Sequence, residues 1–491
     1  MIASREQGGP PATAYDKSVL RRVPWRVLLP VVAGVGVALA PAPSGLTPAA
    51  WHYFALFVAV VFGLVLEPVP AAGVGFIGMA LAAASRLAAP EPDASLKLAL
   101  SGFANGTVWL VFAAFMFALG YERTGLGKRI ALVLVRKLGG RTLGLGYAVM
   151  LADLVLAPFT PSNTARSAGT IFPVIRNIPP LYDSYPGPTA RRIGAYVIWT
   201  EFAATAVTSS MFLTGLAPNL LALGLVEKTI GYRFSMGEWL IGFLPMGLLL
   251  VAVLPWLIYK IYPPTIAGGA EVPRWAGAEL AKMGPVSRNE LTMAGLAVVA
   301  ILLWIFGSDV MEAATAALIV ISLMLLLRLV SWQDIITNKD AWNVLVLLAT
   351  LFGLAEGLNK VGFVAWFAKG SAAALVGLSP TMVMAALVAV FFLVHYMFAS
   401  ITAHATAMLP VVLAAGASVP GVPVKPFALL LCFSLGLMGI ITPYATGPAP
   451  VFYGSGYVSR KEFWTLGLIF GLLFLCVLLG IGIPYLLYLE P

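Results

Sequence analysis

The chain has 491 residues, of which 60% are hydrophobic and only 10% are charged. A soluble protein of this length carries about a quarter charged residues, so the composition excludes an ordinary soluble enzyme. Two cysteines in apolar runs and three histidines exclude a disulfide framework and a His-rich metal site. In a membrane protein, a net charge of +9 is interpreted by the side of the bilayer on which the Lys and Arg residues lie. The expected partner is thus the lipid bilayer and not nucleic acid.

Apolar runs that approach the roughly 20 residues needed to cross a bilayer recur along almost the whole chain. The sequence predicts an all-α polytopic membrane protein with about eleven transmembrane helices. The predicted spans are 27–42, 51–67, 71–86, 105–121, 193–214, 239–262, 290–307, 312–330, 341–358, 425–442 and 463–488.

Two further apolar segments, 143–178 and 381–415, are too long for loops, and each is broken near its middle. The first is split by the proline-containing run 158–164 and the second by 398–401. Because each half is too short to cross a bilayer, the sequence predicts two re-entrant helical hairpins.

Two short motifs occur once in each half of the chain, in the same order and at nearly the same spacing. Residues 162–166 read S-N-T-A-R and residues 400–404 read S-I-T-A-H, while 214–218 and 446–450 share the pattern T-G-x-A-P. An odd number of crossings separates the two copies, so they have opposite orientations. Inverted repeats of this kind are typical of secondary transporters.

The basic residues predict the topology, because Lys and Arg concentrate on the cytoplasmic side. The N-terminus is then cytoplasmic and the C-terminus is outside. The lack of a Ser-rich, acidic-poor transit peptide at the start favours the cytoplasmic (inner) membrane of a bacterium over a plastid envelope. We expect a cytoplasmic segment at 1–26, a first membrane half at 27–262 whose hairpin enters from the cytoplasm, a cytoplasmic linker at 263–289, and a second half at 290–491 whose hairpin enters from outside. The amphipathic segment 125–138 is expected along the inner interface. The cytoplasmic basic residues are Lys128, Arg129, Arg136, Lys137, Arg141, Arg176, Arg191, Arg192, Lys260, Arg274, Lys282 and Arg288.

The two breaks are candidate anion sites. Ser or Asn at a break is typical of an ordinary helix start, but a helix start partway through a bilayer is favourable only beside an anion or a watery cavity. Two such starts from opposite sides form one central pocket. The Gly and Pro residues of the T-G-x-A-P motifs predict unwound backbone with free carbonyls, suited to a cation or to close approach of substrate, unless they are simple proline kinks. The candidate residues here are Thr214, Gly215 and Pro218 in the first motif and Thr446, Gly447 and Pro448 in the second.

Arg166 and His404 occupy equivalent positions, one turn into the second arm of each hairpin. A cation deep in a membrane usually faces a cavity or a partner, so the equivalence favours a pair of positive groups facing an anion. Two alternatives stay open: Arg166 can snorkel or pair with Glu201 or Asp153, and His404 can be a satisfied core residue.

Three carboxyl groups lie within or beside apolar spans, at Asp153, Glu201 and Glu356. They are candidates for proton carriers. Pairing with a neighbouring cation, such as Glu356 with Lys360 one turn on, is the favoured interpretation.

These features together resemble the divalent anion/sodium symporter (DASS) family of di- and tricarboxylate transporters. The strings 162–166 and 400–404 and the run 442–450, T-P-Y-A-T-G-P-A-P, are similar to its exchanger branch of citrate/succinate, tartrate/succinate and 2-oxoglutarate/malate antiporters. The resemblance covers nearly the whole chain after the first 25 residues.

The resemblance implies a homodimer in which a transport domain moves like an elevator against a fixed scaffold. It also implies that substrate carboxylates are held by the hairpin tips, here Ser162, Asn163, Thr164, Ser400 and Thr402. Sodium-coupled members carry Asn in both tips, whereas this chain has Ile401 in the second.

We therefore expect a sodium-independent exchanger of di- or tricarboxylates, with Arg166 and His404 replacing the charge of sodium. An empty carrier would then hold unpaired buried cations, which predicts obligate exchange. The alternative is a sodium-coupled dicarboxylate symporter. No enzymatic activity, metal site or cofactor is expected. Sodium is expected to bind only if the chain is the sodium-coupled symporter. Succinate, malate, fumarate, 2-oxoglutarate, tartrate and citrate all remain candidate substrates, and sulfate is not excluded.

Overall fold

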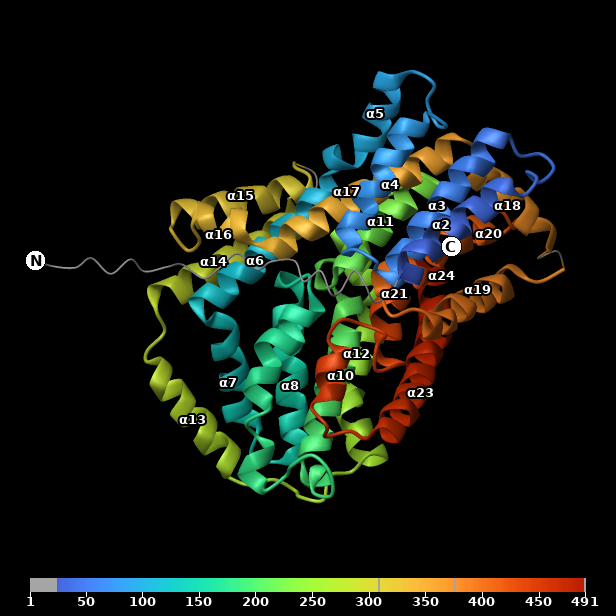
Figure 1. Ribbon diagram of the computed structural model, residues 1–491. Coiled ribbons are helices and arrows are strands. Elements are labelled where there is room, and N and C mark those ends of the chain that lie inside the picture. Colours follow the sequence, from blue (N-terminus) through green and yellow to red (C-terminus); the bar gives the residue numbers. More distant parts are fainter. Residues whose placement is uncertain (1–23, 308–309, 375–376, 490–491) are drawn as a thin grey trace, which may run out of the picture.

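The computed structural model describes residues 24–307, 310–374 and 377–489, and every regular element in these ranges is a helix (Figure 1). The predicted all-α architecture is confirmed for this part of the chain. The predicted cytoplasmic segment 1–26 lies almost entirely outside the described residues.

Each of the predicted spans overlaps one helix. The helices are α2 (Pro24–Leu39), α3 (Pro48–Leu66), α4 (Ala71–Ser85), α6 (Gly106–Thr124), α10 (Gly194–Met211), α12 (Met236–Ile261), α14 (Arg288–Phe306), α15 (Ala313–Leu326), α17 (Lys339–Lys360), α21 (Val424–Leu437) and α23 (Arg460–Val477), the last continuing through the π-helical turn η9 (Leu478–Gly482) into α24 (Ile483–Leu489).

The number of crossings stays a prediction. Within the described residues, six helices are long and apolar enough to cross a membrane, or up to eight if each of two bent pairs counts as one span. Several predicted spans correspond to shorter helices: α2, α4, α15 and α21 contain only 14 to 16 residues. Apolar residues beyond their ends belong to turns, which hydropathy alone does not separate from helix.

Six helices were not predicted from the sequence. The most important is α11, a 14-residue helix where only a short apolar piece at 219–225 was expected. It packs against α17, and Glu356 of α17 pairs with Lys228 of α11 rather than with Lys360 of its own helix. The six are α5 (Pro92–Leu100), α11 (Ala217–Ile230), α13 (Glu271–Met283), α16 (Trp332–Thr337), α18 (Phe363–Ala374) and α22 (Ala449–Gly454).

The linker at 263–289 contains α13, which packs against the amphipathic helix α7 (Leu126–Leu138). Arg129 of α7 fastens the end of this linker to α14. Its Nε lies 2.5 Å from a Glu290 carboxylate oxygen, and its Nη1 donates to the Gly284 carbonyl at 3.0 Å. The basic face of α7 is thus used partly to hold the connection between the two halves.

Both segments predicted as re-entrant hairpins consist of two helical arms joined at a break. The first has α8 (Thr142–Leu156) and the short turn η2 (Ala157–Phe159) before the break, then the π-helix η3 (Thr164–Ile171) and α9 (Phe172–Ile175). The second has α19 (Pro380–Val394) and η7 (His395–Met397), then α20 (Ile401–Ala417). With their terminal turns the first arms reach 18 residues each, longer than expected. The length of the arms therefore does not show whether the two hairpins are re-entrant, and their placement in the membrane stays a prediction.

Helix α10 forms the centre of the half of the molecule that contains the first hairpin. All of its residues are buried, and it packs against α8, α12 and α21. Figure 1 shows these helices below the layer formed by α3, α4, α15 and α17. The polar side chains of α10 therefore face other protein elements, close to the break of the first hairpin.

Candidate substrate site at two helix breaks

The two hairpin breaks have matching geometry. The Ser162 hydroxyl accepts a hydrogen bond from the Ala165 amide at 3.2 Å, and the Ser400 hydroxyl accepts one from the Ala403 amide at 3.3 Å. Each serine thus caps the helix that follows it, as the repeated motif predicted. Both helix starts are left with further backbone N–H groups that have no partner within the helix.

The first T-G-x-A-P segment is tied to the break of the first hairpin. It forms the short turn η6 (Leu213–Gly215), in which the Thr214 hydroxyl donates to the Pro158 carbonyl at 2.6 Å. The Ala217 amide donates to the Pro161 carbonyl at 2.7 Å, and Pro218 lies in the first turn of α11. The unwound loop and the break therefore form one unit.

The second T-G-x-A-P segment lies against the tip of the same, first hairpin. The Asn163 side-chain amide donates to the Thr446 hydroxyl at 2.8 Å, although the two are 283 residues apart. A Cβ atom added to Gly447 would lie only 2.1 Å from the Thr164 hydroxyl oxygen. Only glycine allows this approach, and Pro448 leads directly into α22.

The second hairpin is connected to the second unwound loop by residues at the end of its first arm. His395 Nε2 lies 2.8 Å from the Ala445 carbonyl, just before Thr446, and the Tyr444 hydroxyl donates to the Tyr396 carbonyl at 3.1 Å. His395 is at the end of the first arm, before the break, and was not singled out from the sequence. Its position in the last turn before the break was the available signal.

Hydroxyl groups suited to a carboxylate are present at both tips. Ser162, Thr164, Ser400 and Thr402 are half-buried. The hydroxyls of Thr164 and Thr402 make no hydrogen bond within the described part of the chain. Together with the Asn163 amide and the helix starts, they provide the uncharged donors that a dianion requires.

Arg166 is completely buried, and its guanidinium is fully hydrogen-bonded. Its Nε donates to Asp153 at 2.9 Å, and its Nη1 donates to the carbonyls of Thr160 and Gly215 at 2.9 and 2.8 Å. Its Nη2 lies 3.0 to 3.2 Å from three hydroxyl oxygens of α10. Those hydroxyls belong to Thr205, Thr208 and Ser209.

The structure thus contains the pairing with Asp153 that the sequence left open, while Glu201 accepts no hydrogen bond from Arg166. The guanidinium therefore does not present a free charge, because Asp153 balances it. Its N–H groups instead hold together the break, the unwound loop and α10. The three hydroxyls were missed from the sequence, although their spacing places them on one face of a helix.

His404 has no such partners. It is fully buried, and neither ring nitrogen has a hydrogen-bond partner among the described residues. Its ring centroid lies 4.4 Å from that of Phe391, 4.9 Å from that of Phe398 and 5.0 Å from that of His395. The two residues that the sequence paired are therefore unequal, since Arg166 is satisfied by the fold and His404 is not.

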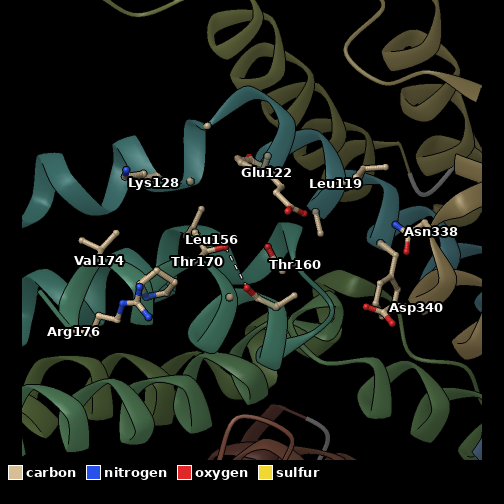
Figure 2. Close-up of a pocket in the computed structure, with 18 residues that line it drawn as sticks. Leu119, Glu122, Lys128, Leu156, Thr160, Thr170, Val174, Arg176, Asn338 and Asp340 are labelled. Atoms are coloured by element: carbon tan, nitrogen blue, oxygen red, sulfur yellow. Dashed lines mark hydrogen bonds between the residues drawn. The ribbon is translucent and has the colours of Figure 1, made fainter. Parts of the chain in front are cut away.

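A cavity of about 640 Å³ lies beside the first hairpin (Figure 2). Its wall includes Thr160 and Ala165 beside the break, but none of the predicted substrate-binding residues Ser162, Asn163, Thr164, Ser400 and Thr402. Figure 2 shows Lys128 and Arg176 toward one end of this cavity and Asp340 toward the other, with Glu122 between them. No group of three or more His, Cys, Asp or Glu side chains suited to a metal ion occurs among the described residues.

Residues 22–490 match the family described as "Sodium:sulfate symporter transmembrane region". Among curated proteins, the chain is 50% identical over 472 residues to the L-tartrate/succinate antiporter of Escherichia coli (strain K12), an alignment that covers 94% of this chain and 97% of the relative. The L-tartrate/succinate antiporter of Shigella sonnei (strain Ss046) matches with the same identity and coverage.

Among solved structures, the chain is similar to the Alcanivorax borkumensis YdaH transporter. The TM-score is 0.52 at 16% sequence identity, covering 80% of this chain and 88% of the other. At this identity the likeness concerns the fold, which is that of a multi-pass membrane transporter.

Proposed function

The chain belongs to the divalent anion/sodium symporter family, in its exchanger branch, and on that premise we propose that it exchanges C4-dicarboxylates across a bacterial cytoplasmic membrane without sodium. It is a transporter and not an enzyme. Tartrate and succinate are the first candidate substrates, because relatives with 50% identity are named for them. Malate, fumarate, 2-oxoglutarate and citrate are further candidates, since they also carry two or three carboxylates.

The observation that carries sodium independence is the pair of hydrogen bonds from Arg166 Nη1 to the Thr160 and Gly215 carbonyls. Transporters with broken helices coordinate sodium through carbonyls of this kind. Here a guanidinium already binds both oxygens and carries its own counter-charge in Asp153. In the second tip, Ile401 supplies no side-chain oxygen.

Recognition of the dianion is assigned to uncharged donors. The half-buried Ser162, Thr164, Ser400 and Thr402 and the Asn163 amide surround two helix starts, whose backbone N–H groups favour negative charge. His404 adds a ring whose nitrogens have no hydrogen-bond partner among the described residues. Each carboxylate is expected to bind one helix start, so that a four-carbon diacid spans both.

The physical reason for obligate exchange differs from the one that the sequence suggested, in which unpaired buried cations made the empty carrier unfavourable. Asp153 already balances Arg166, so an empty carrier does not hold an unpaired guanidinium. The cost of the empty state falls instead on the hydroxyls of Thr164 and Thr402 and the imidazole of His404, which have no hydrogen-bond partner among the described residues. Polar groups left unpaired away from water are costly. A second anion removes this cost and allows the site to return.

The cavity beside the first hairpin is proposed as the route from the cytoplasm. In the predicted topology, the segments that line it end on the cytoplasmic side, and Lys128 and Arg176 lie at one end. An elevator movement of the transport domain, which contains the two hairpins, would close this cavity and open the site on the other side of the membrane. We also propose a homodimer whose contacts are made by the scaffold.

The test is uptake of labelled succinate into proteoliposomes that contain the purified protein. Internal tartrate, succinate or no anion is combined with sodium or potassium buffer. We expect uptake only with internal dicarboxylate and at equal rates in both buffers. Uptake into empty vesicles driven by a sodium gradient would instead identify a sodium-coupled symporter.

A further inference from the structure

Glu201 is a buried carboxyl group that the proposed recognition of substrate does not use. It lies in the middle of α10, and its side chain is 0% exposed. Neither carboxyl oxygen receives a hydrogen bond from the described residues. An ionised carboxylate in such a position would lack every interaction that normally offsets its loss of water.

The charged groups that face Glu201 are Asp153 on α8 and Arg166 on η3. The other helices packed against α10, including α12 and α21, contribute no charged group at this position among the described residues. Asp153 is therefore the neighbouring carboxyl group of Glu201. Two ionised carboxylates side by side repel each other and cannot hydrogen-bond, because both are acceptors.

The remaining hydrogen bonds identify which of the two carboxyl groups is ionised. One Asp153 oxygen accepts from Arg166 Nε, and the other accepts from the Thr208 hydroxyl. The N–H groups of Arg166 are all directed to other acceptors, so none is left for Glu201. Asp153 therefore has the environment of a carboxylate, and Glu201 has that of a carboxylic acid.

We propose that Glu201 is a proton-binding site, occupied in the folded transporter, whose O–H donates to the Asp153 carboxylate. The group formed by Asp153, Glu201 and Arg166 then has no net charge. One guanidinium cannot neutralise the charge of two buried carboxylates at once. Two close carboxyl groups usually share a proton instead.

Two consequences follow, and the first rests on the proposed function. Because Glu201 is 0% exposed, we expect its proton to stay in place during exchange and not to be transported with the dicarboxylate. The second concerns charge balance. If the charge of Asp153 is removed, Glu201 is expected to release its proton to water and to become the counter-ion of Arg166.

The first experiment measures the infrared C=O stretching band of protonated carboxylic acids in the purified full-length protein, identified by its shift in D2O. We expect the band to lose one component in Glu201→Gln. The control is Glu356→Gln, which removes a carboxylate paired with Lys228 and should leave the band unchanged. An unchanged band in a folded Glu201→Gln protein would overturn the proposal.

The second experiment uses Asp153→Asn, so that the proposal does not depend on one variant folding. The Glu201 component of the band should disappear as Glu201 ionises, and a component that persists would overturn its role as a reserve counter-ion. Exchange by Glu201→Gln should stay within about twofold of the wild type between pH 6 and 9, because the amide replaces a neutral acid. A loss of exchange with rising pH in the wild type but not in Glu201→Gln would contradict this, because it would show that Glu201 ionises in that range. The infrared result needs no transport, so failure of the proposed function would leave it intact.

Discussion

Asn163, in the break of the first hairpin, donates its side-chain amide to the hydroxyl of Thr446 in the second repeat at 2.8 Å. The two repeats are therefore joined at the candidate site itself, and not only through their apolar surfaces. Because the amide nitrogen donates to Thr446, the orientation of the Asn163 side chain is fixed by the second repeat. This contact joins the first hairpin to the second unwound loop at the proposed substrate site.

Removing either partner of this contact should weaken substrate binding. We expect Asn163→Ala and Thr446→Val each to raise the KM for succinate about tenfold, corresponding to about 1.4 kcal/mol for a buried hydrogen bond. The double variant should cost less than the two losses together, because both remove the same interaction. Initial exchange rates give the values, with the exposed Asn289→Ala as the control. Full additivity would show that the two residues act independently.

Gly447 should tolerate no side chain. A Cβ atom there would lie 2.1 Å from the Thr164 hydroxyl oxygen and would displace the tip of the first hairpin. Gly447→Ala is expected to reduce kcat/KM by about tenfold or more, in the range of overpacking costs of about 1–3 kcal/mol. The matched control is Gly454→Ala in α22, where no atom lies within 4 Å of an added Cβ. Equal activity of the two variants would contradict the close approach.

Arg166→Ala should act mainly on folding. It leaves Asp153 as a buried carboxylate without its partner and frees the carbonyls of the break, so we expect a loss of about 3–5 kcal/mol in unfolding free energy. Arg166→Lys should recover only part of this, because an ammonium cannot reproduce the planar fork. Thermal unfolding in detergent measures the effect, with exposed Arg136→Ala as the control. An Arg166→Ala protein with full exchange would refute the proposed role.

His404→Phe should weaken substrate binding and leave folding unchanged, whereas Arg166→Ala should act mainly on folding. The ring packs among Phe391, Phe398 and His395, so a phenyl ring preserves the packing and the melting temperature. The loss of two polar nitrogens should raise the KM for dicarboxylates by about tenfold. Binding and unfolding are measured on the same preparation, with exposed His52→Phe for comparison. An unchanged KM would mean that His404 is only a core residue.

Lys128 and Arg176 should affect the arrival of substrate from the cytoplasmic side. We expect Lys128→Gln and Arg176→Gln to raise the KM for internal dicarboxylate severalfold at low ionic strength and hardly at all at high ionic strength, because salt screens exposed charges. The external KM should not change. Lys137→Gln on the same helix, outside the cavity lining, provides the control. An effect that persists at high salt would indicate direct binding instead.

Several features were predictable because they depend on nearby residues. Helix formation follows apolar runs, and the breaks follow prolines and serines whose capping bonds span three residues, as with Ser162 to Ala165 and Ser400 to Ala403. Helix lengths were less predictable, since apolar residues continue into turns. Helix α11 was underestimated because its interior contains glycine, glutamate and lysine in place of an unbroken apolar run.

The membrane class, the helices that overlap the predicted spans, the two breaks and the repeated pair of motifs could be predicted from the sequence, because each depends on local composition and spacing. The partners of the buried polar groups depend on tertiary packing. Asp153 and Glu201 were equal candidates for Arg166 until the packing of α8 and α10 gave Asp153 the guanidinium and left Glu201 without a donor. In the same way, packing brought Ala445 to His395, Thr446 to Asn163, and Glu356 to Lys228. A buried polar group is stabilised by the group that the fold places within hydrogen-bonding distance, and that distance is not encoded in sequence separation.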